Sequence, residues 1–317
     1  MAPPIISYFY SHLILKLPVP NKSFTGSTVI VTGANSGLGL EAARHFARLD
    51  ASKVILAVRD PNKGAAAKTS ILASSDLASS ISVRSFAARA NNLERLDIVV
   101  QNAGVLTHDF ERVETNERTI TVNVINTFLL ALLLLPKLRG TSTELNKEVV
   151  MTFTGSLVHW LASFPERNSA SILEALADKD KADMRQRYPL SKLLELMAFR
   201  ELSETIKQSS KPGKIVTSMV NPGSVLTGLD REGHGLRGLI WSVYVRAIGR
   251  TAEEGSRTLV HAAQGGRDTH GQYLDDCKVG RTSDFVNSEA GRDAQKKFWG
   301  ELIALLEDIE GGVTQNL

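Results

Sequence analysis

Cysteine is nearly absent from this sequence: Cys277 is the single one among 317 residues. One cysteine excludes a disulfide bond within the chain and fits a reducing compartment, so we expect a cytoplasmic protein. The 7 histidines are scattered, with no pair at the spacing of a zinc site. Because neither residue type forms a ligand pattern, we expect no bound metal.

The sequence also has no large excess of charge of either sign. The 37 basic and 34 acidic residues leave a formal net charge of +3, and the two signs are interspersed along the chain. A nucleic-acid-binding protein needs a concentrated basic surface, so we expect no nucleic acid partner.

The N-terminal segment is apolar but short. Residues 5–19 are interrupted by His12 and Lys16, are too few to span a bilayer, and lack the basic leader and cleavage site of a signal peptide. Two interpretations stay open. Either residues 1–23 form an arm packed on the domain, or residues 5–19 form an amphipathic segment in weak contact with a membrane surface.

What the sequence does contain is a strand, a glycine turn and a helix in immediate succession. Thr28–Thr32 is a β-branched apolar run typical of a buried strand, and Leu40–Arg48 is a helix-forming run. Between them stand Gly33, Gly37 and Gly39. Glycines let a backbone approach a pyrophosphate, and a helix N-terminus offers unpaired N–H groups. The stretch predicts an anion site, although glycine-rich turns also close ordinary strand–helix units.

A second buried strand, Lys53–Val58, completes the unit that binds one mononucleotide. Arg59 stands at its tip, where the adenosine ribose of a dinucleotide is recognised, and its planar guanidinium suits a 2′-phosphate. Lys63 can add a second positive charge, whereas Asp60 is better placed to cap the next helix. We therefore expect NADP(H) rather than NAD(H).

Strands and helices alternate from residue 24 to residue 317 without a long linker. This pattern predicts an α/β fold with one doubly wound, Rossmann-type parallel sheet, and a glycine-rich substrate loop at about 228–250. The third strand is the difficulty, because Gly64–Ala73 and Leu77–Asn92 both favour helix. Either Ile71–Ala73 takes the place of the strand, or this edge strand is shortened or missing.

The sequence also predicts a long helix over Asn116–Leu135. Its end, Phe128–Leu135, is apolar on every side, so it must be buried in the core or against a second subunit. We favour a subunit interface for part of it and expect a homodimer.

Tyr188 and Lys192 are four residues apart at the start of a predicted helix, hence on one face. A nearby ammonium and a positive nicotinamide ring would favour the phenolate and lower the tyrosine pKa from about 10. A Tyr-x-x-x-Lys pair is weak evidence alone, because surface helices produce it by chance.

The order of the parts is more specific. The chain contains, in this order, Thr32-Gly33-x-x-x-Gly37-x-Gly39, Asn102-Ala103-Gly104, Asn123, Ser156, Tyr188-x-x-x-Lys192 and Pro222-Gly223. On these motifs the sequence resembles, from about Phe24 to its end, the short-chain dehydrogenase/reductase family. The stretches Ala57–Gly64, Ser82–Ala87 and Arg250–Gly255 carry a narrower resemblance to fungal members related to retinol dehydrogenases and the WW-domain oxidoreductase.

The resemblance implies four catalytic roles. Tyr188 would be the general acid in carbonyl reduction and the base in alcohol oxidation. Ser156 would hydrogen-bond the substrate oxygen. Lys192 would bind the nicotinamide ribose and lower the tyrosine pKa, and Asn123 would hold a water in a proton relay. His159, three residues past the serine, is more typical of a structural histidine than of a pocket residue.

The resemblance also implies a set of cofactor contacts. Those at the pyrophosphate would be Gly33, Asn35, Ser36, Gly37, Leu38 and Gly39. The adenosine would lie along Asn102, Ala103 and Gly104, with Asp76 at the adenine amino group, and the nicotinamide would contact Pro222, Gly223, Val225 and Thr227. Because Asp76 normally follows the third strand, loss of that strand would damage the adenine pocket.

The expected function is that of an NADP(H)-dependent oxidoreductase that interconverts a carbonyl and an alcohol on a lipophilic small molecule. Ketone reduction in a fungal secondary-metabolite pathway is the favoured form, with the apolar stretch from Leu229 to Ile248 covering the substrate. The alternative is a catalytically impaired, dinucleotide-binding regulatory protein. The presence of Ser156, Tyr188 and Lys192 counts against it.

Overall fold

The computed structural model describes residues 5–59, 70–226 and 246–317. Their strands form one large sheet in the order β10-β9-β8-β7-β4-β1-β2-β3, parallel except for β10. The strands are β1 (Thr28–Thr32), β2 (Lys53–Val58), β3 (Ser70–Ser74), β4 (Ile98–Gln101), β7 (Glu148–Thr154), β8 (Lys214–Asn221), β9 (Gln272–Asp275) and β10 (Lys278–Val279). This order confirms the predicted doubly wound Rossmann-type sheet.

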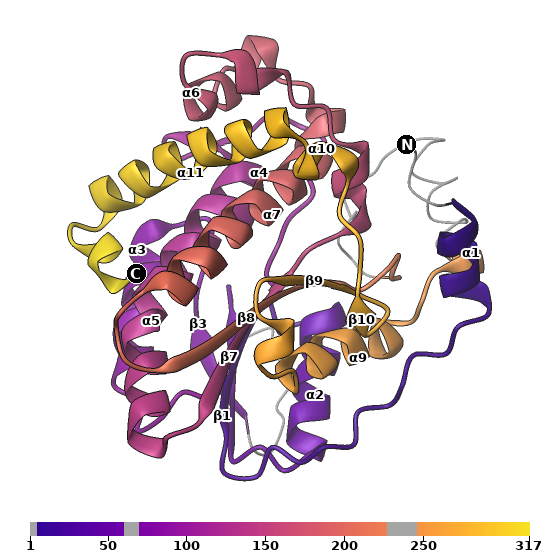
Figure 1. Cartoon of the computed structure of the whole chain (residues 1–317), viewed down its shortest axis with the longest axis vertical. Coiled ribbons are helices and arrows are strands. Elements are labelled where there is room, and N and C mark those ends of the chain that lie inside the picture. Colours follow the sequence, from indigo (N-terminus) through magenta and orange to yellow (C-terminus); the bar gives the residue numbers. More distant parts are fainter. Residues whose placement is uncertain (1–4, 60–69, 227–245) are drawn as a thin grey trace.

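Helices cover both faces of the sheet (Figure 1). Alternate residues of β1 divide between the two cores: Val29 and Val31 pack with α2 and α9, and Ile30 packs with the opposite layer. The main helices are α2 (Gly37–Arg48), α3 (Ser80–Asn91), α5 (Asn126–Leu145), α7 (Met184–Gln208), α9 (Ala252–Ala263) and α11 (Glu289–Ile309).

Shorter elements connect these helices and strands. They are α1 (Ile5–Leu13), β5 (Arg112–Val113), β6 (Asn116–Glu117), α4 (Arg118–Ile120), the π-helical turn η2 (Thr121–Ile125), α6 (Ile172–Leu176), α10 (Asp284–Asn287) and the short turns η3 (Leu157–Leu161), η4 (Pro165–Asn168), η5 (Lys179–Lys181), η7 (Arg267–Thr269) and η8 (Val313–Asn316).

The third strand is present. The backbone of β3 pairs in parallel with β2 over five residue pairs, from Val54↔Ser70 to Val58↔Ser74. Of the two alternatives, the one that gives Ile71–Ala73 to the strand is confirmed, and a missing strand is wrong. Helix propensity misleads here because the open edge of β2 offers a ladder of backbone hydrogen bonds that local sequence does not register.

The apolar helix lies inside the single chain. All of Phe128–Leu135 except Leu133 is buried, and the stretch packs on α3, on the sheet and under the C-terminal turn η8. Helix residues Arg118–Leu145 are long and apolar enough to cross a membrane, but 89% of the most apolar window is buried within the protein. The prediction that part of this helix forms a subunit interface is therefore wrong, because the chain covers it with its own α3 and η8.

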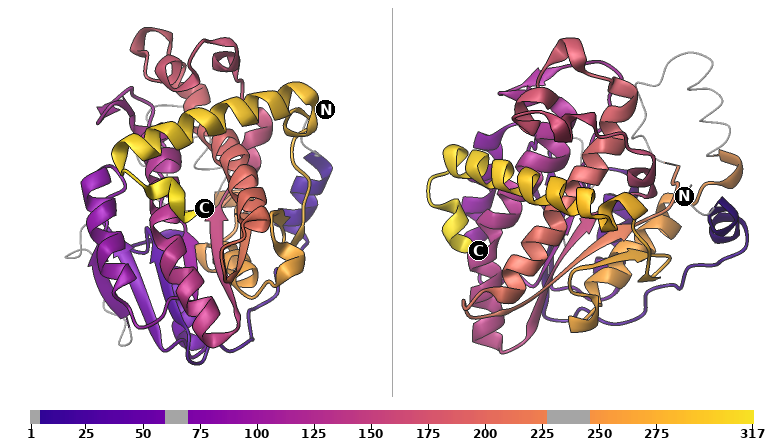
Figure 2. Two further views of the ribbon diagram at one scale, coloured as in Figure 1. Left: turned by 60° about the vertical axis from the view of Figure 1, so that its left-hand side comes forward. Right: turned by 45° about the horizontal axis from the view of Figure 1, so that its top comes forward.

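The N-terminal segment runs along one side of the molecule (Figure 2). After α1, an extended stretch crosses α9 and α2 before it enters the sheet. Arg257 of α9 donates to the main-chain oxygen of Leu17 at 2.9 Å, and Arg48 of α2 donates to that of Pro20 at 2.9 Å. These contacts fix the path of the segment, so that α1 ends up beside the carboxyl edge of the sheet.

Candidate active site

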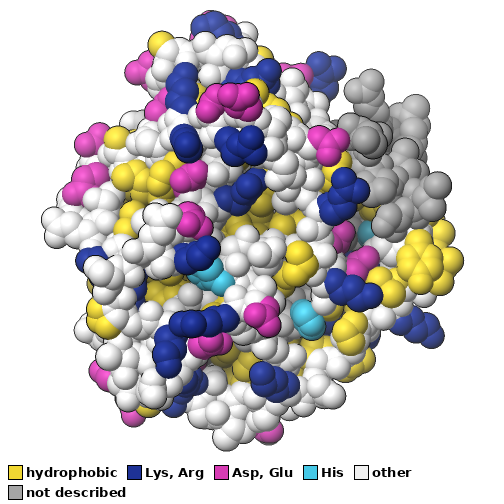
Figure 3. Space-filling model, viewed as in Figure 1, with side chains coloured by type: hydrophobic (Ala, Val, Ile, Leu, Met, Phe, Trp, Pro, Cys, Tyr) yellow, Lys and Arg dark blue, Asp and Glu magenta, His cyan; other side chains and the backbone are white. Residues whose placement is uncertain are grey.

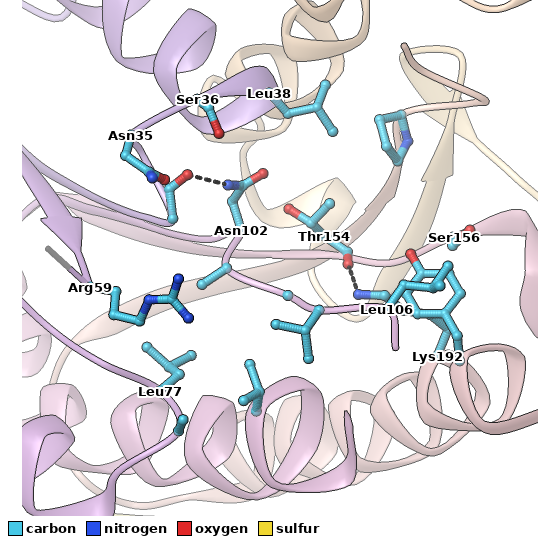
Figure 4. A pocket seen from close by; sticks show the side chains of 18 of the residues that line it. Asn35, Ser36, Leu38, Arg59, Leu77, Asn102, Leu106, Thr154, Ser156 and Lys192 are labelled. Atoms are coloured by element: carbon cyan, nitrogen blue, oxygen red, sulfur yellow. Dashed lines mark hydrogen bonds between the residues drawn. The ribbon is translucent and has the colours of Figure 1, made fainter. Parts of the chain in front are cut away.

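A cleft of about 380 Å³ lies at the carboxyl ends of the parallel strands, the usual place for a ligand in this kind of sheet. In Figure 4, Asn35, Ser36 and Leu38 lie along one side, Arg59 and Leu77 at one end, and Thr154, Ser156 and Lys192 at the other.

The glycine turn between β1 and α2 allows two backbones to meet closely. Gly33 has φ +64°, and a Cβ there would lie 2.8 Å from the Cα of Ala103. A Cβ at Gly39 would lie 2.5 Å from Nδ2 of Asn102. Any larger residue would push the turn away from the end of β4. Gly33 and Gly39 therefore allow the turn to pack closely on the end of β4, and Gly33 itself lines the cleft.

Hydrogen bonds of Thr32 join the glycine turn to the residues that follow β4. Its hydroxyl oxygen accepts the backbone N–H groups of Asn102 and Ala103, both at 2.9 Å, and the Asn102 side chain donates to the Thr32 carbonyl at 2.9 Å. Within the described chain, Ser36 at the N-cap of α2 makes no side-chain capping bond. The first N–H groups of α2 are thus left for an anion, which fits a pyrophosphate.

The opposite end of the cleft is built by β2 and β3. Arg59 follows β2 and is exposed, while Ser75 and Asp76 follow β3. The Asp76 carboxylate accepts the N–H of Ala78 at 3.0 Å, which orients it beside the cleft. Because β3 is present, the wall at the adenine end of the cleft, which loss of the third strand would have removed, is formed.

Helix α7 brings Tyr188 and Lys192 to the other end. It begins a turn earlier than predicted, because Asp183 caps it by accepting the N–H of Arg185. Arg187, immediately before the tyrosine, is 1% exposed and forms a buried ion pair with Glu117 at 3.5 Å. This pair holds the first turn of α7 against α4.

Three polar side chains converge there. Ser156 and Tyr188 both line this end of the cleft, and the serine hydroxyl acts to lower the pKa of the phenol. The Lys192 ammonium lies 6.0 Å from the centre of the tyrosine ring and donates to the Thr154 carbonyl at 2.7 Å (Figure 4). It also donates to the Glu195 carboxylate at 2.8 Å, in a pair whose side chains are only 6% and 3% exposed.

Burial and the Glu195 carboxylate dominate the electrostatics of this cluster. Burial raises the pKa of the Tyr188 phenol; the Lys192 ammonium acts against this, and the Glu195 carboxylate adds to it. Burial alone would lower the pKa of Lys192, but Glu195 and Tyr188 outweigh it, so that pKa is raised. Among the protein's own groups, burial therefore outweighs the ammonium. The predicted lowering, which also involves a positive nicotinamide ring, stays a prediction.

Comparison with known proteins decides the family. A family model described as short chain dehydrogenase matches residues 27–150. The short chain dehydrogenase/reductase dmxR8 of Cryptosporiopsis sp. is 40% identical over 328 residues, covering 98% of this chain and 100% of the relative. The chain belongs to the short-chain dehydrogenase/reductase family. It is an oxidoreductase, as predicted, and the family's cofactor is a nicotinamide dinucleotide.

Other comparisons agree on the family and the fold. The short chain dehydrogenase atnD of Emericella nidulans is 45% identical, covering 86% of this chain and 90% of the relative. Among solved structures, a 3-ketoacyl-(acyl-carrier-protein) reductase from Brucella melitensis complexed with NADH is 20% identical, with TM-score 0.58 over 80% of this chain and 97% of that chain. A 3-oxoacyl (acyl-carrier-protein) reductase from Agrobacterium tumefaciens with NADP bound is 20% identical, with TM-score 0.59 over 80% of this chain and 93% of that chain.

Most of the predicted site residues of this dehydrogenase/reductase line one cleft. Those are Gly33, Asn35, Ser36, Leu38, Arg59, Asp76, Asn102, Ala103, Gly104, Ser156, Tyr188, Lys192, Pro222, Gly223 and Val225. Gly37, Gly39 and Asn123 are not among the described lining residues. Lys63, Thr227 and nearly all of the predicted substrate loop lie outside the described residues.

Asn123 lies behind the cleft, in the π-helical turn η2. Its side chain accepts the N–H of Val105 at 2.8 Å and donates to the carbonyl of Val105 and the hydroxyl of Ser191, both at 3.0 Å. A Cβ at Gly104 would lie 3.4 Å from its Oδ1 and 4.0 Å from the Lys192 ammonium. The side chain thus ties the end of β4 to α7 beside the lysine, and its role in a proton relay stays a prediction.

His159 has the structural role that the sequence favoured. Its Nε2 accepts the N–H of Ser283 at 3.2 Å, so Nδ1 carries the proton and donates to the Ser156 carbonyl at 2.7 Å. Burial lowers its pKa to about 4. The ring is therefore neutral near pH 7 and supports the backbone of the serine.

Sequence reasoning missed several lining residues. They follow the ends of strands or begin the next helix, a position that could have marked them: Ser75, Leu77 and Ala78 after β3, Val105, Leu106 and Thr107 after β4, and Arg118 and Val122 in α4 and η2. Glu195 was missed although it stands three residues from Lys192, because spacing does not show that both are buried.

Proposed function

We propose that this protein is an NADP(H)-dependent oxidoreductase that interconverts a carbonyl and an alcohol on a lipophilic small molecule. Ketone reduction in a fungal secondary-metabolite pathway is the proposed physiological form. The observation that carries the proposal is the convergence of Ser156, Tyr188 and Lys192 at one end of a cleft whose floor is the glycine turn.

The side chains of this site account for the binding of the substrate oxygen and for the proton transfer to or from it. The bound cofactor supplies or accepts the hydride at the carbonyl carbon. The Ser156 hydroxyl holds the substrate oxygen, and the Tyr188 phenol gives that oxygen a proton in reduction or takes one in oxidation. The Lys192 ammonium binds the nicotinamide ribose hydroxyls and favours the phenolate. A buried site strengthens each of these interactions because water competes less for them.

Arg59 supports the preference for NADP(H). It is exposed at the tip of β2, at the same end of the cleft as Asp76 and Leu77. A guanidinium suits a 2′-phosphate, which NADP(H) has and NAD(H) lacks. The two solved relatives, one with NADH and one with NADP, share the fold, so the preference must come from residues such as this one.

Replacing Arg59 with alanine tests that preference. We expect the Kd for NADPH to rise by about 10- to 100-fold, as for loss of a charge-assisted hydrogen bond, and the Kd for NADH to stay within about twofold. Titration with each cofactor, followed by nicotinamide fluorescence, measures both. Arg44→Ala is the control, since it removes the same charge from a residue of α2 that does not line the cleft. Equal affinity of the unaltered protein for NADH and NADPH would contradict the proposal.

The same titration separates the enzyme from the alternative of an impaired regulatory protein. That alternative depended on a damaged third strand, and β3 has its full ladder with β2. If neither NADPH nor NADH saturated the unaltered protein, the enzyme proposal would be overturned.

The remaining proposals concern organisation. We propose an arm of residues 1–23, one domain over 24–317, a homodimer, and a cytoplasmic protein in weak contact with a membrane surface through residues 5–19. Support for the last comes from Phe9, Tyr10, Leu13 and Ile14, whose exposed fractions run from 41% to 67%. Figure 3 shows hydrophobic side chains gathered at the right-hand edge, where Figure 1 places α1. Sedimentation of the protein alone tests the homodimer, and cosedimentation with anionic vesicles tests the membrane contact.

A further inference from the structure

The inner face of α1 contacts a wall of the cleft. Pro222, Gly223 and Val225 line the cleft, at the end that we assign to the nicotinamide, but Ser224 between them does not. Instead, the Ser224 hydroxyl accepts the Tyr8 phenol at 2.6 Å. Thus a segment more than 200 residues away in sequence reaches the back of this turn.

His12, one helical turn after Tyr8, binds the backbone of the same turn. Its Nδ1 donates to the Tyr8 carbonyl at 2.9 Å, which leaves Nε2 to accept the N–H of Ser224 at 2.8 Å. The two rings stack at 4.1 Å. Burial lowers the pKa of His12, with Arg250 acting in the same direction and Asp276 against it, so the neutral form that can accept is favoured.

Arg250 joins α1 and the turn from a third direction. Its guanidinium is 4% exposed, and it donates to the Pro222 carbonyl at 3.1 Å and to the Ser11 hydroxyl at 2.8 Å. Asp276 closes the group by accepting both Arg250 and Ser11. The positive charge of Arg250 is therefore paired with Asp276. The N–H groups of its guanidinium donate to backbone and side-chain oxygens of α1 and the turn.

The turn has no room to move toward this group. Gly223 has φ +81°, and a Cβ there would lie 2.7 Å both from Nη1 of Arg250 and from Nε2 of His12. One side of the turn thus lines the cleft while the other is closed by α1. The contacts of Arg257 with Leu17 and of Arg48 with Pro20 fix the segment that carries α1.

We infer that α1 is a positioning element of the cofactor site, which holds the Pro222–Val225 turn in the conformation that the nicotinamide half of the cofactor needs. The inference rests on the proposed function of the cleft. The turn's backbone would otherwise have to be ordered when the cofactor binds, and ordering it in advance improves affinity. Within α1, His12 carries most of this role, because its Nε2 accepts a backbone N–H of the turn directly.

Substitution of His12 by alanine tests the inference. We expect the Kd for NADPH and the KM for the cofactor to rise by about three- to tenfold, the effect of losing one hydrogen bond, with the KM changing more than kcat. His12→Gln keeps an acceptor and should recover part of the affinity. Tyr10→Ala, on the exposed face of the same helix, should bind NADPH as the unaltered protein does.

Three results would overturn the inference. The first is an unchanged Kd in a folded His12→Ala protein, and the second is an equal loss in Tyr10→Ala. If His12→Ala does not fold, Tyr8→Phe removes only the hydroxyl bonded to Ser224, and an unchanged Kd in that variant is the third. Failure of the unaltered protein to bind either cofactor would instead overturn the proposed function, on which the inference depends.

Discussion

Replacing Tyr188 with phenylalanine is expected to lower kcat for carbonyl reduction by about 10²- to 10⁴-fold, the usual contribution of a positioned general acid. The substitution removes a single hydroxyl, which faces the same end of the cleft as Ser156, and keeps the aromatic ring. Steady-state kinetics with NADPH and a panel of apolar ketones measures the loss.

Cofactor binding is the internal control for this variant. The phenol is not needed to hold the pyrophosphate or the adenosine, so the Kd for NADPH should change by less than about threefold, while the proton at the substrate oxygen is lost. Turnover within about tenfold of the unaltered enzyme would refute the assignment of proton transfer to Tyr188.

Replacing Lys192 with alanine is expected to damage the fold as well as the reaction. The ammonium and the Glu195 carboxylate are buried together, 2.8 Å apart. Removing one member of such a pair leaves an uncompensated buried charge and typically costs about 3–5 kcal/mol. Urea denaturation at pH 8 should show a decrease of that order in the free energy of unfolding.

The loss should depend on pH in a defined direction. Burial already raises the pKa of Glu195, and removal of Lys192 raises it further, because the ammonium lowers it. A group whose folded pKa lies above its unfolded value favours the folded state at low pH and loses that effect as pH rises through the folded pKa. Relative to the unaltered protein, Lys192→Ala should therefore be less destabilised at pH 5 than at pH 8.

A double variant separates the two consequences. Lys192→Met combined with Glu195→Gln removes both charges at similar volume, so most of the lost stability should return while turnover stays low. Equal stability of the single and double variants at pH 8 would show that the pair is not what Lys192→Ala breaks. Because of this pair, an inactive Lys192→Ala protein would not by itself establish a catalytic role for the lysine.

The family resemblance singled out most of the chemistry-bearing residues, and local rules explain why they meet. Tyr188 and Lys192 share a helix face by their spacing, and Ser156, Asn102 and Arg59 each follow a buried strand. Parallel strands bring such residues to one edge of the sheet. The third strand was not settled in the same way, since a short run containing alanine pairs with an open sheet edge despite its helix propensity.

An apolar sequence also does not say what covers it. Phe128–Leu135 must be buried on all sides, and the choice between a second subunit and the chain's own helices depends on where α3 and the C-terminal turn lie. Those helices are far from it in sequence, so only the assembled fold identifies them.

By itself the sequence determined the doubly wound sheet and the glycine turn, because strand ends and glycine spacing are local properties. The serine, tyrosine and lysine were assigned through the family resemblance. Tertiary structure alone decided that Glu195 is buried against Lys192 and that His12 holds the turn at Ser224. The burial of Glu195 depends on how completely the packed helices exclude water. The contact of His12 with Ser224 joins residues 212 apart in the chain, and no local pattern encodes such a contact.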